Sequence, residues 1–177
     1  AMAEGLRRVG VRACYATAAV GSLVPEWTPG TLVACSDLLD FTGRRLTLHD
    51  RAVVHTDFTD PFGPEPRAAL LWAAAKLSET IQDKGTYLGL DGPRYETPQE
   101  IRTWRQLGAE VVGMTASTEA ILMREAGVPY SCLAIVTNLG TGISEVPVDH
   151  SAVVDVMSDV GPRVLNLLRE ATTYLAR

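Results

Sequence analysis

The chain has 177 residues, of which 46% are hydrophobic, and its mean hydropathy is +0.08. This length and composition predict one globular domain, residues 1–177, with a substantial core. The net charge of −5 without a basic run argues against a nucleic-acid-binding surface, and no apolar segment is long enough to span a bilayer.

The cysteine pattern predicts free thiols. Cys14, Cys35 and Cys132 lie in apolar runs, are odd in number and form no CxxC spacing. Such thiols are typical of a reducing compartment, and the N-terminus lacks the layout of a signal peptide, so we expect a cytoplasmic protein. The histidines are widely dispersed, and the sequence therefore predicts no metal site.

The N-terminal part predicts the end of a helix followed by a strand. Residues 1–8 have the pattern of the last turns of a helix that ends at Gly10, and residues 11–17 form an apolar run typical of a strand. Small residues at 18–22 predict a tight turn. Such a turn either simply reverses the chain or lets backbone N–H groups near Ala18 reach an anion.

The next segment combines regular and irregular patterns. Residues 31–39 predict another strand, and residues 65–83 predict a helix with one apolar face. Residues 40–64 between them lack a regular pattern and are long for a connection. This indicates a functional or intersubunit loop.

Residues 85–138 are the most informative part of the chain. Apolar runs at 85–90, 109–114 and 131–137 predict three buried strands separated by two helices, which is the order expected for an α/β sheet with crossover helices. Ligands of such sheets usually bind at the carboxyl ends of the strands. We therefore expect a site among the residues that follow these runs.

Glu96 follows the first of these runs. Thr97, Pro98 and Glu100 form the pattern of a capping box with proline at the first helical position, so Glu96 lies just before a predicted helix. A carboxylate is favoured near a helix N-terminus. This position is compatible with a functional role and equally with a solvated surface residue.

Met114 and Thr115 stand at the end of the second run, and Asn138 follows the third. Met114 on its own is more often a core residue, and Asn138 on its own is a common turn residue. An Asn side chain also offers a donor and an acceptor side by side, which suits the edge of a heterocyclic base. Together with Glu96, these residues indicate one polar site at three strand ends.

A last helix is predicted from about residue 149. It has an apolar stripe and should be kinked at Gly161-Pro162, because proline removes a backbone donor. His150 lies in its first turn and either caps the helix, faces water or contributes to the site.

Several motifs occur in order along the chain: GTY and GPRYET within residues 85–97, LGAEVVGMT at 107–115, AGVPY at 126–130 and AIVTN at 134–138. ATAAVGSL at 16–23 and Asp149-His150 add to them. This set resembles the trimeric purine nucleoside phosphorylases, a family that includes the methylthioadenosine and methylthioinosine phosphorylases. The resemblance spans nearly the whole chain.

The resemblance implies an α/β fold with a central mixed sheet flanked by helices. In the family, an additional N-terminal segment supplies sheet strands and much of the phosphate site. Nothing in this chain matches that segment, so we expect either an N-terminally incomplete member or a reduced relative. The resemblance also implies a homotrimer in which one loop reaches the neighbouring subunit's active site, and His55 and Phe62 match the contact positions of that loop.

The resemblance further implies roles for the site residues. Asn138 and Glu96 are the candidate catalytic residues, which hold the purine. The candidate substrate-binding residues are Ala18 at the ribose and phosphate, Tyr95 on the purine face, Met114 on the ribose, Thr115 at the phosphate and His150 at the ribose 5′-hydroxyl.

The implied activity is phosphate-dependent cleavage of the N-glycosidic bond of a 6-oxopurine (deoxy)ribonucleoside, with no cofactor. A Glu96 carboxylate accepts a hydrogen bond from N1–H of hypoxanthine or guanine, whereas adenine presents an acceptor there. The motifs GPRY and HTDFTDPF favour a methylthioinosine or methylthioadenosine phosphorylase instead, and His150 favours the plain nucleoside. A catalytically incomplete nucleoside-binding or assembly module and a hydrolytic nucleosidase are further alternatives.

Overall fold

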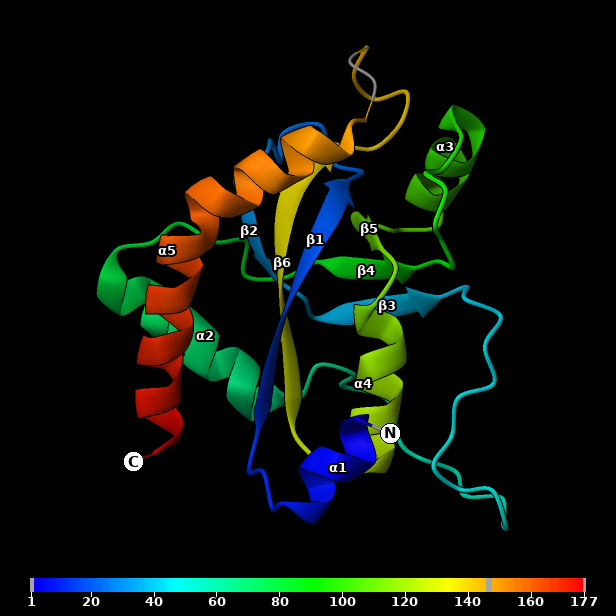
Figure 1. Ribbon diagram of the computed structural model, residues 1–177, viewed down its shortest axis with the longest axis vertical. Coiled ribbons are helices and arrows are strands. Elements are labelled where there is room, and N and C mark those ends of the chain that lie inside the picture. The colour runs from blue at the N-terminus through cyan, green and yellow to red at the C-terminus, as the bar shows by residue number, and fades with distance from the viewer. Residues whose placement is uncertain (1, 146–147, 177) are drawn as a thin grey trace.

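The computed structural model describes residues 2–145 and 148–176. At its centre is a six-stranded sheet in the order β2-β6-β1-β5-β4-β3, flanked by helices (Figure 1). The strands are β1 (Cys14–Ser22), β2 (Leu32–Ala34), β3 (Asp37–Asp40), β4 (Thr86–Gly89), β5 (Val111–Gly113) and β6 (Tyr130–Leu139). The helices are α1 (Met2–Arg8), α2 (Pro64–Leu77), α3 (Pro98–Gln106), α4 (Ala116–Glu125) and α5 (His150–Leu175).

The two longest strands, β1 and β6, form the middle of the sheet. They pair in parallel along their whole lengths, with a register shift between Val20 and Gly21. β1 also pairs antiparallel with β5, at Gly21 and Ser22, whereas β3, β4 and β5 are parallel to one another. The sheet is therefore mixed, as the resemblance implies, and Figure 1 shows β3, β4 and β5 running across the direction of β1 and β6.

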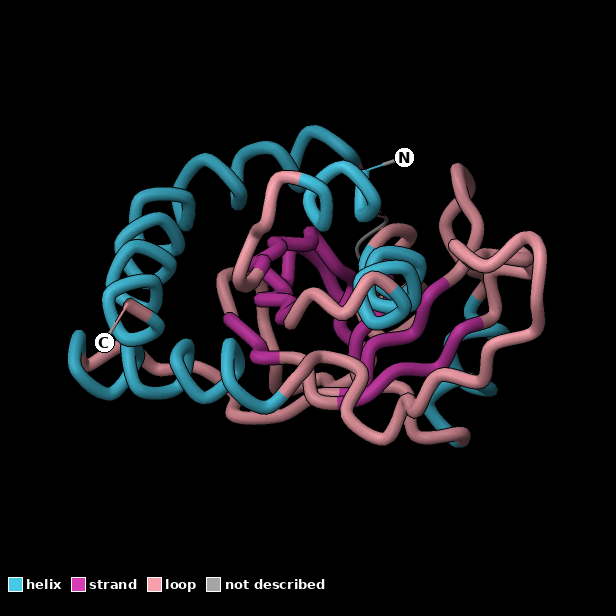
Figure 2. Tube along the Cα trace, turned by 90° about the horizontal axis from the view of Figure 1, so that it is seen from below, coloured by secondary structure: helices cyan, strands magenta, loops and turns pink. Residues whose placement is uncertain are grey.

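Alternate residues of β6 point to opposite faces of the sheet, as in any strand. Leu133 packs with α2 and α5 in one buried cluster, and Cys132 packs with α4 in another that contains Tyr87 and Met123. Figure 2, seen from below, shows α2 and α5 together at one side of the strands. Both faces of β6 are thus buried, which explains its continuous apolar sequence.

Three predicted elements differ in the structure. The strand predicted at 31–39 is wrong, because β2 and β3 lie at opposite edges of the sheet and the chain crosses between them at Cys35 and Ser36. The turn predicted at 18–22 is also wrong, since pairing with β6 keeps these small residues in β1. The helix predicted at 65–83 ends at Leu77, where Ser78 adopts a left-handed conformation with φ of 55°.

The last helix begins at His150 and contains Pro162 in its interior. Proline cannot donate the helical hydrogen bond, and Figure 1 shows α5 bending along its length, as the sequence predicts. Within residues 2–145 and 148–176, no helix is both long and apolar enough to cross a membrane. Cys14, Cys35 and Cys132 are free thiols.

Candidate active site

A half-open cleft of about 390 Å³ lies where the ends of β1, β5 and β6 meet, a size within the range of small-molecule sites. The segment before α3 and the start of α5 complete its walls. The cleft brings together most of the residues singled out in the sequence: Ala18, Tyr95, Glu96, Met114, Thr115, Asn138 and His150. The three strand ends therefore form one site.

Glu96 is the buried carboxylate of this cleft. Its exposure is 9%, and burial raises the pKa of its carboxyl above the usual value, with the charge of nearby Glu100 adding to the effect. Arg94 pairs with Glu100 instead, through hydrogen bonds of 2.8 and 2.9 Å. Because a buried acceptor without a donor is costly, Glu96 is suited to accept a hydrogen bond from a ligand.

The predicted capping box holds the segment that carries Glu96. The Thr97 hydroxyl accepts a hydrogen bond from the backbone N–H of Glu100 at 3.2 Å, and the Glu100 carboxylate accepts one from the backbone N–H of Thr97 at 2.8 Å. The N-cap of α3, Thr97, thus directly follows Glu96, and the helix begins at Pro98. The capping box is confirmed.

Asn138 lies opposite Gly21 in the register of β1 and β6. The Thr137 hydroxyl donates to its Oδ1 at 3.1 Å, and its Nδ2 donates to the Leu139 carbonyl at 3.0 Å. This orientation leaves a second N–H and a second lone pair of the amide for a ligand. A Cβ on Gly21 would lie 3.1 Å from Nδ2, so glycine leaves the room that this amide needs.

Tyr87 supports the turn between β5 and α4, a role that the sequence reasoning missed. Its phenolic oxygen accepts hydrogen bonds from the backbone N–H groups of Thr115 and Ala116, both at 3.2 Å. Burial raises the pKa of this phenol above its usual value. A Cβ on Gly113 would clash with the same oxygen. The sequence feature that could have indicated this support is Tyr87 in one strand together with a glycine at the end of the next strand.

His150 lies in the first turn of α5, where the Asp149 side chain accepts a hydrogen bond from the backbone N–H of Ser151 at 3.3 Å. Val148 and Val153 line the cleft beside it. Among the described lining residues, His150 is the one with a basic side chain. An anion in this cleft therefore meets mainly backbone N–H groups and hydroxyls.

His55 and Phe62 lie apart from this cleft. His55 lines a separate exposed hollow with Val54 and Glu125. Phe62 is 1% exposed and stacks on Tyr130, with ring centroids 6.2 Å apart, so its side chain belongs to the core. Their contact with a neighbouring subunit stays a prediction. Because Phe62 is buried within this chain, the structure does not favour such a contact for its side chain.

The chemistry of the cleft suits a planar heterocycle held by its edge. Glu96 supplies an acceptor, Asn138 supplies a donor and an acceptor, and Tyr95 supplies an aromatic ring that is partly exposed. In the part of the chain that the structure describes, no group of three or more His, Cys, Asp or Glu residues is arranged to hold a metal ion.

Comparison with known proteins agrees with this chemistry. Residues 1–173 match the family described as the phosphorylase superfamily. A probable 6-oxopurine nucleoside phosphorylase of Moorella thermoacetica is 42% identical over 97% of this chain, and the match covers 68% of that protein. A probable S-methyl-5′-thioinosine phosphorylase of Methanopyrus kandleri is 38% identical over 99% of this chain and 69% of its own length.

Solved structures share this fold. The methylthioadenosine phosphorylase of Schistosoma mansoni in complex with adenine superposes with a TM-score of 0.93 at 27% identity. The superposition covers 98% of this chain and 68% of that protein.

Proposed function

The chain belongs to the phosphorylase superfamily, and we propose that it is a purine nucleoside phosphorylase that cleaves 6-oxopurine (deoxy)ribonucleosides. The reaction uses inorganic phosphate to break the N-glycosidic bond and yields the free base and ribose 1-phosphate. The observation that carries the proposal is the pairing of Glu96 and Asn138 in one cleft. Phosphate is the co-substrate, and the reaction needs no further cofactor.

Base selection follows from these two side chains. The Glu96 carboxylate accepts N1–H of hypoxanthine or guanine, while the free N–H of the Asn138 amide donates to N7 and O6. Adenine presents an acceptor at N1, which would leave two buried acceptors facing each other. Such a mismatch discriminates strongly, so the pair selects 6-oxopurines.

Bond cleavage passes through a state in which the ribose becomes cation-like and the purine gains negative charge. Asn138 stabilises that charge, since its amide is already oriented by Thr137 and Leu139. Met114 packs on the ribose and Tyr95 on the purine face. The Thr115 hydroxyl, in the turn supported by Tyr87, and the backbone of β1 near Ala18 bind phosphate.

The test is incubation with inosine, with and without phosphate, followed by measurement of free hypoxanthine. We expect release that depends on phosphate and is much slower with adenosine. Release without phosphate would instead indicate a hydrolytic nucleosidase. Hypoxanthine binding without any release would indicate a nucleoside-binding module.

A methylthioinosine phosphorylase is the second candidate. Relatives bear this name, and Val148 and Val153 give the cleft an apolar wall beside His150. An apolar wall suits a 5′-methylthio group, whereas His150 suits a 5′-hydroxyl. Comparing kcat/KM for inosine and methylthioinosine, in the wild type and in His150→Val, separates the two.

We also propose that the protein is a cytoplasmic homotrimer that serves purine salvage. Residues 43–60 form a long segment outside the named helices and strands, and it leaves Val53 85% exposed. Covering such a side chain in an assembly is favourable. Light scattering at micromolar concentration tests this, and a fully active monomer would contradict it.

A further inference from the structure

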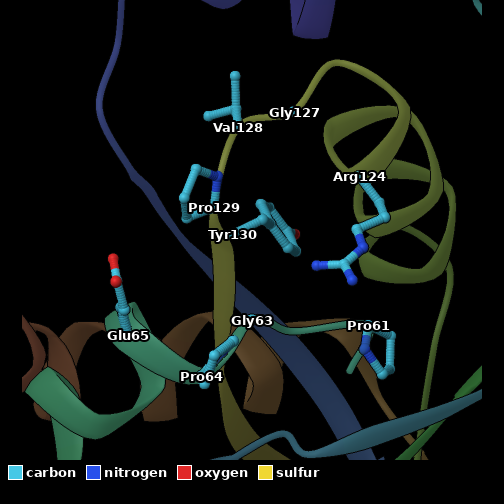
Figure 3. A pocket seen from close by; sticks show the side chains of 9 residues that line it. All are labelled: Pro61, Gly63, Pro64, Glu65, Arg124, Gly127, Val128, Pro129 and Tyr130. Carbon is cyan, nitrogen blue, oxygen red and sulfur yellow. The ribbon is translucent and has the colours of Figure 1, made fainter. Parts of the chain in front are cut away.

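A second cleft, of about 360 Å³, lies at the opposite end of β6 from the candidate active site (Figure 3). β6 begins here at Tyr130 and reaches the active site at Asn138, and the two clefts share no lining residue. Apart from Arg124 and Glu65, the lining residues are apolar or glycine: Pro61, Gly63, Pro64, Gly127, Val128, Pro129 and Tyr130.

The walls of this cleft are rigid. Three prolines restrict the backbone, and Tyr130 is held on both sides. Its ring stacks on Phe62, and its hydroxyl donates to the Glu119 carboxylate at 2.8 Å. A pocket that is already formed binds with a smaller entropic cost than one that must be ordered.

Arg124 is the cation of the cleft. In Figure 3 its guanidinium group points toward the space beside Tyr130, whereas Glu65 points away from that space. Its Nε donates to the backbone carbonyl of Asp57 at 2.8 Å. The Nη2 atom lies 3.5 Å from the Asp57 carboxylate, which is too long for a strong hydrogen bond.

The Asp57 carboxylate is stabilised mainly by other donors. Thr59 donates to it through its hydroxyl at 2.7 Å and through its backbone N–H at 3.1 Å. These bonds, more than the charge of Arg124, lower the pKa of Asp57. The N–H groups of Arg124 that do not face Asp57 are therefore available to an anion.

The composition of the cleft defines the ligand class. A guanidinium fork matches the two oxygens of a carboxylate, and the apolar walls suit a ring. A phosphate dianion would need more cations than the one that lines this cleft. We propose that this second cleft binds a small aromatic monocarboxylate, with the carboxylate on Arg124 and the ring against Tyr130 and the prolines. The site is independent of the activity proposed above.

The experiment is an NMR titration of the ¹⁵N-labelled full chain with benzoate, in the presence of saturating hypoxanthine. We expect saturable shifts at the backbone amides of Gly63, Gly127 and Tyr130, and none at Asn138. Benzyl alcohol, which keeps the ring, and acetate, which keeps the charge, should each bind at least about tenfold more weakly, because each lacks one half of the recognition. Shifts at Asn138 in place of those around Tyr130 would overturn the proposal.

Variants separate the role of the guanidinium from general effects on folding. Arg124→Gln should raise the Kd for benzoate at least about tenfold, since a charge-assisted bond is lost. The matched control is Arg163→Gln, which breaks an exposed pair with Glu79 (2.8 Å) outside either cleft and should leave the Kd unchanged.

Pro64→Phe provides an independent test if Arg124→Gln fails to fold. Pro64 is exposed at the rim, so a larger side chain there narrows the cleft without touching the guanidinium. It should also raise the Kd for benzoate at least about tenfold. Benzoate binding that is equal in the wild type and in the folded variants, or absent in the wild type, would overturn the proposal.

Discussion

In the proposed function, base choice depends on two side chains, Glu96 and Asn138, and is therefore a property of single residues. We predict that Asn138→Asp raises the ratio of adenosine to inosine cleavage about tenfold, because a protonated carboxyl donates to N7 of adenine while its other oxygen accepts from the 6-amino group, which the free N–H of Asn138 cannot do. Steady-state kinetics with both nucleosides measure it. Gly21→Ala is the control, since its Cβ would meet the Asn138 amide at 3.1 Å and should weaken both substrates without changing the ratio. Equal wild-type rates on adenosine and inosine would contradict the assignment.

The pKa of Glu96 sets a pH dependence. Burial raises this pKa, and in the proposed function the carboxylate form is the one that accepts N1–H. Hypoxanthine affinity should therefore fall about tenfold for each pH unit below the raised pKa. Glu96→Gln should bind more weakly at neutral pH and without this dependence. Isothermal titration between pH 5 and 8 gives both curves, and parallel curves would exclude Glu96 as the acceptor.

The same carboxyl affects stability with a defined sign. Because its pKa is raised in the folded chain, its stabilising contribution is complete below the unfolded pKa and is lost as the pH rises through the folded pKa. The ligand-free Glu96→Gln variant should therefore gain in Tm relative to the wild type as the pH rises. The gain in Tm is about 2–4 °C for each kcal/mol by which the free energy of unfolding rises. Thermal unfolding across the same pH range measures it, and a gap that narrows with pH would contradict the sign.

At the scale of elements, the start of α3 positions the Glu96 segment. Thr97→Ala removes the cap and should cost about 1 kcal/mol, or about 2–4 °C in Tm. Hypoxanthine binding should weaken as well, because the chain before the helix is freed. Thr103→Ala is the matched control: its hydroxyl bonds the Gln99 carbonyl within α3 and caps nothing. An unchanged Tm in Thr97→Ala would show that Arg94 and Glu100 fix the segment without it.

Elements defined by neighbouring residues were predictable, and those defined by distant ones were not. The capping box at Thr97 depends on residues three apart, and it is present. The division of residues 31–39 depends on where β6 and β4 lie. The backbone N–H of Cys35 donates to the carbonyl of Cys132 in β6, and the backbone N–H of Ser36 donates to the carbonyl of Gly85, just before β4. Small residues at 18–22 favour a turn locally, and pairing with β6 overrides this preference.

The position of the site was predictable as well, because the ends of the strands can be recognised from neighbouring residues. Met114 ends an apolar run, and Glu96 and Asn138 each follow one, so their meeting was predictable from the order of elements. The support by Tyr87 was not, because it joins β4 to the start of α4 through a bond that no local pattern encodes. The second cleft combines Arg124 with residues 61–64 and was equally invisible in the sequence.

At the scale of the whole molecule, the cleft offers more side-chain contacts to the purine base than to phosphate. For the proposed reaction, the cleft offers the base a buried carboxylate and an oriented amide, whereas it offers phosphate backbone groups near Ala18, the Thr115 hydroxyl and no described Lys or Arg of the lining. A phosphate dianion in a partly desolvated cleft needs several charge-assisted donors. The relatives extend further, since this chain spans about 68% of their length.

We therefore predict that the 177-residue chain binds hypoxanthine far more tightly than phosphate and turns over inosine slowly. The family resemblance implies that an N-terminal segment supplies much of the phosphate site. Joining the chain to such a segment from one of the relatives should therefore strengthen phosphate binding and raise kcat. The KM for inosine should change less, since the base contacts are already in place. Titration with phosphate and hypoxanthine release, with and without the added segment, measure both effects. Tight phosphate binding with brisk turnover by the chain alone would mean that the anion site is built from other residues.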